Sequence, residues 1–400
     1  MERKKRIILH SDLNNFFASV SLLYNQTLTD FPVAVAGSVE NRHGIILAKN
    51  EIAKKYGVKT AEPVWQAKNK CPDLCILPPI YEKYEEFSKA AKEIYYRYTD
   101  IVEPFGIDEC WLDVTHSVFL FGDGKTIAER IRKEIKEELG ITASVGVSFN
   151  KVFAKLGSDL KKPDAVSQIT KENFKEVVWP LPITDMLFVG KNTAKRLKEL
   201  GIYKIGDIAA CPQETLKHAF GKNGEQLYLC ANGLDTTPLV SEITAPLPKS
   251  IGKSETGKYD LKTESDIWNA LLSYSEEISI QLREKELYAC GVQLITRTPN
   301  LISKEFSQKL NTPTNVGLII AKAGMELFNN NKVLPLRSVG IRVINLKQNC
   351  GFVQQNLFGE NDAEKQNEIE NEMDEINKKF GKDSIKRASV MLHKNKNNKH

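Results

Sequence analysis

The stretch Phe105-Gly106-Ile107-Asp108-Glu109-Cys110-Trp111-Leu112-Asp113 decides the fold. Gly106 loosens the backbone ahead of a short strand whose apolar bulk includes Trp111. Adjacent side chains on a strand point to opposite faces, so Asp108 and Glu109 can serve one site only at a strand end or turn. Neighbouring carboxylates beside buried residues repel each other unless a cation neutralises them. Taken alone, such a pair is more often a solvated turn than a site for a hard cation such as Mg²⁺.

Outward from this stretch, a second acid stands near the N-terminus. Residues 7–9 are apolar and predict a buried strand that ends near Asp12, after which the chain turns into a helix. An acid at a strand end can offer its carboxylate to a metal ion, and its neighbour Leu13 can offer a backbone carbonyl. With Asp108 and Glu109, Asp12 therefore predicts a two-metal site for phosphoryl transfer, which asks a protein chiefly for positioning and charge neutralisation.

Two aromatic residues, Phe16 and Phe17, follow Asp12 by one helical turn. They could wall a pocket for a flat or sugar-like ligand, or they could pack the helix against the sheet. The residues alone leave both alternatives open.

Composition bounds the class of protein. A chain of 400 residues predicts two to four domains, and 41% hydrophobic with 27% charged residues is typical of a folded protein. The formal net charge of +5 permits a polyanionic partner without requiring one. Of the seven cysteines only Cys71 and Cys75 are close, and no second pair completes a zinc site. Without a signal sequence or a membrane-length apolar run, we expect a cytoplasmic protein that makes no membrane contact.

Three segments resemble the catalytic signatures of the Y family of translesion DNA polymerases, most closely the bacterial DNA polymerase IV type. They are DLNNFFASV at 12–20, GIDECWLD at 106–113 and ASVGVSFNKVFAKLGSDLKKP at 143–163. The resemblance implies a multidomain α/β and α+β fold with the right-hand architecture of polymerases. It also implies a DNA-directed DNA polymerase that adds dNTPs to a primer 3′-end.

The resemblance assigns roles to the acids. It implies that Asp12, Asp108 and Glu109 are catalytic and bind two Mg²⁺ ions, with the carbonyl of Leu13 as a further metal ligand.

The resemblance also implies the nucleotide contacts. Phe17 would be the steric gate that excludes a 2′-hydroxyl, with Phe16 beside it, and Lys162 would reach the incoming triphosphate. Lys162 has independent support, because Pro163 ends a helical run with cations exposed, although a helix C-terminal charge is the alternative.

The expected fingers helix, near residues 50–56, departs from the family. Members commonly carry a Tyr and an Arg there to hold the triphosphate, where this chain has Glu51 and Lys54. Lys54 keeps the charge but loses the bidentate fork of Arg. Glu51 would repel phosphate if it pointed inward, so we expect it to turn outward or to pair with Lys54 or Lys55. Ser21 is a third departure, at a position where Glu is usual.

The implied domain order has four parts. The catalytic palm spans 1–170 with fingers inserted at roughly 19–77, and the helical thumb spans 171–240. The little finger spans 241–348, and a flexible tail covers 349–400. Within the palm, residues 126–139 predict an amphipathic helix.

DNA contacts are expected in the thumb and the little finger. Gly190 and Lys191 would bind phosphate at the start of a thumb helix, as in helix-hairpin-helix elements, although Phe188 stands where the first hairpin glycine would be. In the little finger the expected contacts are Ser250, Gly252, Lys253, Arg297, Arg337 and Arg342.

A short motif follows the last expected domain. Gln354, Leu357 and Phe358 fit the Gln-x-x-Leu-Phe peptide that polymerases insert into the sliding clamp, where an apolar Leu-Phe anchor supplies the hot spot. We therefore expect three partners or substrates, primer-template DNA, dNTPs and the sliding clamp. We also expect the protein to be a monomer.

Two rival functions remain at this point. A nucleotidyl cyclase also has a palm with acids at strand ends, but it needs neither thumb hairpins nor a clamp peptide. A catalytically weak DNA-binding and clamp-binding accessory protein is the alternative that Glu51 keeps open.

Overall fold

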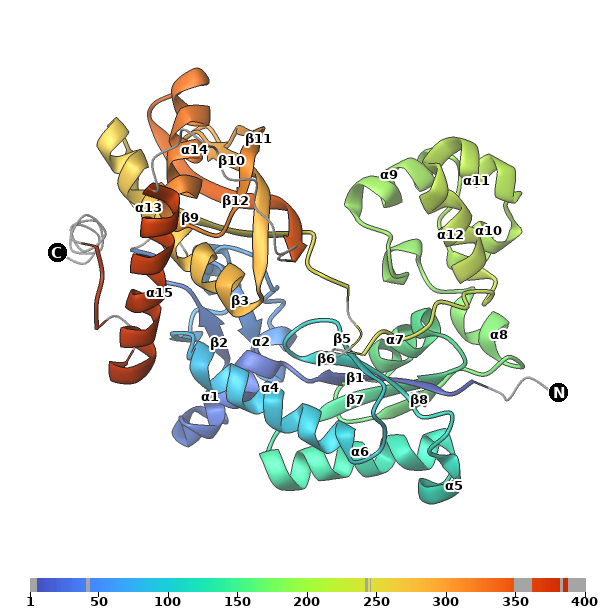
Figure 1. Cartoon of the computed structure of the whole chain (residues 1–400). Helices are drawn as coiled ribbons and strands as arrows, with labels where there is room; N and C mark the ends of the chain where they lie inside the picture. The colour runs from blue at the N-terminus through green and yellow to red at the C-terminus, as the bar shows by residue number, and fades with distance from the viewer. Residues whose placement is uncertain are drawn as a thin grey trace. The chain divides into compact units, whose positions relative to one another are not determined.

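The computed structural model describes residues 6–40, 44–241, 244, 246–348, 362–381 and 384–387 (Figure 1). The chain divides into two compact units, Met1–Gly37 with Gly44–Ala245 and Ser38–His43 with Pro246–His400. No helix in the described ranges is long and apolar enough to cross a membrane.

A five-stranded sheet organises the first unit. Its order is β5-β6-β1-β7-β8, and the strands are β5 (Val102–Pro104), β6 (Glu109–Asp113), β1 (Ile8–Leu13), β7 (Ala143–Ser148) and β8 (Val166–Gln168). The central strand β1 pairs antiparallel with both β6 and β7, and β8 runs parallel to β7. The strand carrying the first acid therefore lies beside the strand carrying the other two.

The two faces of this sheet receive different residues of β1. Leu9 and Leu13 point into a large core with α1 (Phe16–Leu23), α4 (Tyr81–Tyr96) and α6 (Gly124–Leu139). Ile8 points to the opposite face, which α7 (Lys151–Leu160) covers. By alternation Asp12 shares the α7 face, so the acid lies on the side away from the main core.

The amphipathic helix expected at residues 126–139 is confirmed as α6. Ile127, Ile131 and Ile135 are fully buried along one stripe. Asp123 caps its start by accepting a hydrogen bond from the backbone of Thr126 at 2.8 Å. The short helix α5 (Val118–Phe121) precedes it.

A small second sheet in the first unit corresponds to the expected fingers. Its order is β3-β2-β4, with β2 (Val33–Ala36), β3 (Ile46–Lys49) and β4 (Cys75–Leu77). The associated helices are η1 (Gln26–Leu28), α2 (Glu51–Lys55) and α3 (Val64–Lys70). The helix expected near residues 50–56 is thereby confirmed.

Helices alone form the region after β8. They are α8 (Phe174–Val178), η2 (Ile183–Asp185), α9 (Lys191–Glu199), α10 (Ile205–Ala210), α11 (Gln213–Phe220) and α12 (Lys222–Ala231). Their buried faces share one apolar core, in which Leu197, Ile205 and Leu216 are fully buried.

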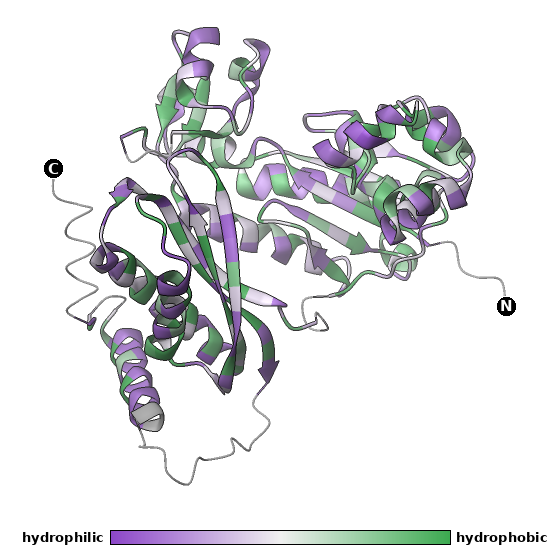
Figure 2. Cartoon of the chain, turned by 90° about the horizontal axis from the view of Figure 1, so that it is seen from above, coloured by the Kyte–Doolittle hydropathy of each residue, from purple (hydrophilic) through white to green (hydrophobic). Residues whose placement is uncertain are grey.

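The second unit has a four-stranded antiparallel sheet of order β11-β10-β12-β9. Its strands are β9 (Ser250–Leu261), β10 (Leu287–Arg297), β11 (Ser303–Thr314) and β12 (Leu336–Gln348). One face packs on α13 (Glu264–Glu284) and α14 (Gly317–Asn330). Figure 2 shows hydrophobic and hydrophilic segments along the same long strands, as expected where one face is covered and the other is open.

The region expected to be a flexible tail contains a docked helix, α15 (Asp362–Phe380), which corrects that expectation for these residues. Glu370 is 4% exposed and lies 2.8 Å from Arg283 of α13 and 2.9 Å from Arg387. The same carboxylate accepts a hydrogen bond from the backbone N–H of Gly317, 2.9 Å away, at the start of α14. Ionic contacts, which leave no apolar periodicity in a sequence, hold this helix in place.

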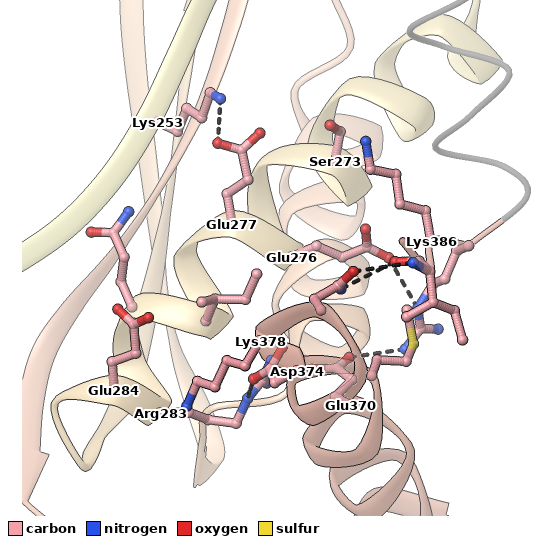
Figure 3. A pocket seen from close by; sticks show the side chains of 16 residues that line it. Lys253, Ser273, Glu276, Glu277, Arg283, Glu284, Glu370, Asp374, Lys378 and Lys386 are labelled. Carbon is pink, nitrogen blue, oxygen red and sulfur yellow. Dashed lines mark hydrogen bonds and ion pairs between the residues drawn. The ribbon is translucent and has the colours of Figure 1, made fainter. Parts of the chain in front are cut away.

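A pocket of about 790 Å³ lies along this contact (Figure 3). It is lined by α13, by α15 and by the segment that ends at Arg387. Asp374 of α15 contacts Arg283 at 2.6 Å, and Glu276 of α13 lies 3.0 Å from Arg387. The charged groups around the pocket are therefore largely paired with one another.

Candidate active site

The three predicted acids meet at one end of β1 and β6. The register of the two strands places Asp12 opposite Glu109, the first residue of β6. Asp108 stands just before that strand, and its carbonyl accepts a hydrogen bond at 3.0 Å from the backbone N–H of Leu13. The backbone thus places all four residues predicted as metal ligands at the same end of the sheet.

Two lysines accompany these acids. The ammonium of Lys162 lies 2.7 Å from Oδ2 of Asp12, and Lys155 forms an ion pair with Glu109. His10, which is fully buried on β1, places Nε2 3.2 Å from Oε2 of Glu109. Among the described residues, no three His, Cys, Asp or Glu side chains converge as a ready-made metal site.

Burial and charge separate the acidities of the three carboxyls. Burial raises the pKa of Asp12 to about 6, although Lys162 opposes the change. Burial and the adjacent Glu109 raise the pKa of Asp108. Burial also acts upward on Glu109, but contacts from His10 and Lys155 outweigh it and hold its pKa at about 2.

These shifts test whether the residues suit a divalent cation. A raised carboxyl pKa, caused by burial and by a like charge nearby, means that too little positive charge surrounds the carboxylate. A hard cation that prefers oxygen ligands would supply that charge. The donor set of three carboxylates and one backbone carbonyl fits such an ion.

The close packing of α7 on the sheet places Lys155, and Lys162 just after the helix, next to the acids. A Cβ atom added to Gly146 of β7 would lie 1.9 Å from the carbonyl oxygen of Ala154, so α7 can rest on the strand only because position 146 is glycine. Asn150 fixes the start of α7 by accepting a hydrogen bond at 2.8 Å from the backbone of Phe153. Sequence reasoning missed Lys155 and His10, although a histidine within an apolar strand was a visible signal.

Trp111 of β6 lies beneath this charged group, as expected of a core residue. It is 2% exposed, and its Nε1 donates to the carbonyl of Lys151 at 3.0 Å. The ammonium of Lys151 lies 4.5 Å from the ring centre, and the ring of His10 lies 5.1 Å away.

The two phenylalanines occupy different environments. Phe16 is 3% exposed and belongs to the main core, so the packing alternative holds for its side chain, and its expected nucleotide contact stays a prediction. Phe17 is half-buried and stacks on Tyr84 with ring centres 4.1 Å apart, while Tyr81 meets it edge-on at 6.1 Å. Part of Phe17 therefore remains available to a ligand.

The fingers residues adopt the paired arrangement that we expected for Glu51. Lys54 places Nζ 3.4 Å from Oε1 of Glu51. The same oxygen accepts a hydrogen bond at 2.9 Å from Nδ2 of Asn15, a contact that the sequence did not reveal. Ser21, the third departure, is buried and lies 2.7 Å from the hydroxyl of Tyr84.

The predicted thumb contacts lie at a helix start. Gly190 is the residue before α9 and Lys191 is the first residue of that helix. Phe188 has a positive φ of 73° and is 61% exposed, so a residue other than glycine supports this turn.

The predicted little-finger contacts fall on different faces of the sheet. Ile251 of β9 and Val343 of β12 face the helices, so Ser250, Gly252 and Arg342 face the open side. Arg297 ends β10 on the open side, and Arg337 is on β12.

Lys253 is different, because it lies 3.1 Å from Glu255 and forms an ion pair with Glu277 of α13. Because these ion pairs occupy its ammonium, we leave Lys253 out of the phosphate contacts proposed below. The clamp-motif residues 354, 357 and 358 lie outside the described ranges.

Family models match most of the chain. A model described as the impB/mucB/samB family matches residues 11–159, and one of that family's C-terminal domain matches 248–357. A model described as the thumb domain of DNA polymerase-iota matches 186–235.

Two curated relatives match nearly the whole chain. A DNA polymerase IV of Acetivibrio thermocellus is 46% identical over 390 residues, covering 97% of this chain and 98% of that protein. DNA polymerase IV 1 of Bacillus subtilis is 36% identical over 395 residues, covering 98% and 94%. Among solved structures, a Y-family DNA polymerase chimera of Dbh and Dpo4 superimposes with a TM-score of 0.76 at 26% identity, covering 86% of this chain and 100% of that one.

Proposed function

This chain belongs to the Y family of DNA polymerases, of the bacterial DNA polymerase IV type, and from that membership we propose how its residues carry out the reaction. It is a DNA-directed DNA polymerase of the translesion type, which acts on DNA and nucleotides and uses divalent metal ions. Neither rival function, the cyclase or the catalytically weak accessory protein, has support in relatives that match along the whole chain.

We propose that Asp12, Asp108, Glu109 and the carbonyl of Leu13 hold two Mg²⁺ ions. When bound, the ions neutralise the triphosphate and favour ionisation of the primer 3′-hydroxyl. The observation that carries this proposal is the register of Asp12 opposite Glu109, with Asp108 adjoining, at one end of the sheet.

The lysines have a role in the same cycle. Lys162, now 2.7 Å from Asp12, would exchange that carboxylate for the phosphates of the incoming nucleotide. The primer hydroxyl then attacks the α-phosphate, and pyrophosphate leaves with its charge partly balanced by Lys162 and Lys54. Lys54 has to loosen its contact with Glu51 to take part.

Phe17 is the proposed steric gate. Its ring stacks on the ring of Tyr84, and this contact supports a fixed position of the Phe17 ring against the sugar. A 2′-hydroxyl on the incoming nucleotide would meet this ring.

The proposed domains are those expected from the sequence, with the tail redefined to include α15. DNA phosphates would contact the backbone at Gly190 and Lys191 in the thumb. In the little finger, Ser250, Gly252, Arg297, Arg337 and Arg342 would supply further contacts.

We also propose that the segment containing Gln354, Leu357 and Phe358 binds the sliding clamp, and that the protein acts as a cytoplasmic monomer. The motif and its position after the last domain support the clamp contact. Size-exclusion chromatography with light scattering, with and without purified clamp, tests the clamp contact and the monomeric state.

A primer-extension assay tests the function as a whole. Purified protein with primer-template DNA, Mg²⁺ and the four dNTPs should lengthen the primer and release pyrophosphate. A cyclase would instead convert a nucleoside triphosphate without primer, and an accessory protein would bind the DNA without extending it.

A further inference from the structure

Asn15 uses its side chain in an unusual way. It precedes α1, a position where an asparagine side chain commonly accepts a hydrogen bond from the first helical turn. It makes no such bond, and its backbone is left-handed with φ 49° and ψ 36°. Its Nδ2 instead donates to Oε1 of Glu51 at 2.9 Å. The amide therefore links the turn after β1 to the fingers helix α2.

Glu51 stands on a fixed support. It is the first residue of α2, and the preceding Asn50 caps that helix by accepting a hydrogen bond from the backbone of Ala53 at 2.9 Å. Nδ2 of Asn50 also donates to the carbonyl of Phe31 at 2.8 Å, which ties the helix start to the neighbouring loop. Although burial acts to raise the pKa of Glu51, contacts from Asn15 and Lys54 outweigh it and lower that pKa, so the carboxylate is ionised at neutral pH.

The turn at Asn14 and Asn15, which leads into α1 and is called the Phe17 turn below, is anchored on both sides. On the palm side, Nδ2 of Asn14 donates to Oγ of Ser144 at 2.9 Å, and Oδ1 of Asn14 accepts from the backbone of Asp164 at 2.8 Å. On the fingers side, the contact is that of Asn15 with Glu51. Phe17 follows two residues later, so a shift of this turn moves the ring.

We propose that Glu51 is a positioning residue for sugar selection, which fixes the Phe17 turn through Asn15 instead of contacting the triphosphate. The inference rests on the proposed role of Phe17 as a gate. Rejection of a 2′-hydroxyl depends on close contact with the ring, and a misplacement of about 1 Å can change rates by as much as 100-fold. Glu51 can therefore occupy this position of the fingers helix because its carboxylate oxygen accepts the hydrogen bond from Asn15 that holds the turn.

Two substitutions at one position separate the hydrogen bond from the charge. Glu51→Gln keeps an oxygen that can accept from Asn15, whereas Glu51→Ala removes it. Single-nucleotide incorporation gives kcat/KM for a dNTP and for the matching rNTP. We expect Glu51→Ala to lower the dNTP-to-rNTP ratio about 3- to 10-fold, the range that the typical net contribution of one hydrogen bond corresponds to. Glu51→Gln should stay within about twofold of the wild type.

Asn15→Ala breaks the same contact from the other side. It should reproduce the Glu51→Ala ratio, and the double variant should be no worse than either single one, because both remove one interaction. Additive losses would mean that the two residues act separately and would overturn the proposal.

The remaining outcomes are also decisive. If Glu51→Gln and Glu51→Ala both lower the dNTP KM and leave the ratio unchanged, the carboxylate repels the triphosphate and the positioning role is wrong. Phe17→Ala, measured alongside, separates this role from the gate. A ratio that falls with Phe17→Ala but not with Glu51→Ala overturns the positioning role alone. A ratio that Phe17→Ala leaves unchanged overturns the gate and this inference with it.

Discussion

Two lysine ammonium groups lie against the carboxylates that are proposed to bind metal. Lys162 contacts Asp12, and Lys155 contacts Glu109. Each lysine balances a buried negative charge that would otherwise be costly. The same contacts would compete with a cation, so the proposed metal binding would be linked to release of the lysines.

Substitution of either of the adjacent acids, Asp108 or Glu109, should slow the chemical step and spare DNA binding. We expect Asp108→Ala or Glu109→Ala to lower primer extension by on the order of 100-fold or more, since each removes charge at the reacting centre. Extension at saturating Mg²⁺ and primer-template affinity are the two measurements. Asp100→Ala, an exposed acid, is the control. Near-normal extension by either variant would exclude that acid from the metal site.

The gate can be tested against its buried neighbour. Phe17→Ala should lower the dNTP-to-rNTP ratio by on the order of 10-fold or more, because the ring is proposed to fill the space of a 2′-hydroxyl. Phe16→Leu should leave the ratio unchanged and lower the free energy of unfolding by about 1 kcal/mol or more, because Phe16 lies in the core. A ratio altered by Phe16→Leu alone would reverse the two assignments.

Local signals explain which site residues could be predicted. Asp12, Asp108 and Glu109 stand beside apolar strands, and that pattern is visible in the chain. The contact of Lys155 with Glu109 requires α7 to lie on β7, which depends on the close approach at Gly146. The pairing of Asn15 with Glu51 joins residues 36 positions apart and has no local pattern.

At the scale of elements, α15 is the main departure from the sequence-based expectation. Its contacts with α13 include ion pairs with Arg283 and a hydrogen bond from Ser279 to Glu370, which lie 91 residues apart in the chain. Meanwhile Ile369, Ile376 and Phe380 are exposed, so these three apolar residues do not mark the docked face. A pattern search for a buried apolar stripe therefore misses this helix.

The buried carboxylate of α15 should be essential for docking. Glu370→Gln leaves Arg283 and Arg387 without their charged partner, and removing one member of a buried ion pair costs about 3–5 kcal/mol. We expect faster amide hydrogen exchange throughout α15 and at Gly317, whose N–H donates to Glu370. Glu372→Gln, on the exposed side of the same helix, should leave exchange unchanged. Equal exchange in the two variants would contradict the ionic docking.

The stability of the protein should also depend on pH through Glu276. Burial raises the pKa of this carboxyl from 4.5 to about 7, despite the opposing charge of Arg387. A raised pKa means that stability present below pH 4.5 is lost as the pH rises through 7. Glu276→Gln should therefore stabilise the protein by roughly 1–3 kcal/mol at pH 8 and have little effect at pH 4.5. Denaturant unfolding at both pH values measures this difference, and an equal effect at both would contradict it.

At the scale of the whole molecule, DNA binding is spread over several proposed phosphate contacts in both units. Affinity should therefore fall with salt, by about 100-fold between 50 and 200 mM for roughly four charged contacts. Arg342→Gln should reduce the slope by about one, whereas Lys253→Gln should not change it, because Lys253 pairs with Glu277. Fluorescence anisotropy over a salt series measures both slopes. A flat response would contradict the proposed thumb and little-finger contacts.

Trp111 gives the active site an optical signal of its own. The indole lies against the ring of His10 and the ammonium of Lys151, and on β6 it is two residues from Glu109. Any rearrangement of these neighbouring groups alters the electric field across the indole and hence the fluorescence emission of Trp111. Cation binding can thus be followed by intrinsic fluorescence in unlabelled protein, with Trp65, Trp179 and Trp268 replaced by phenylalanine to isolate the reporter.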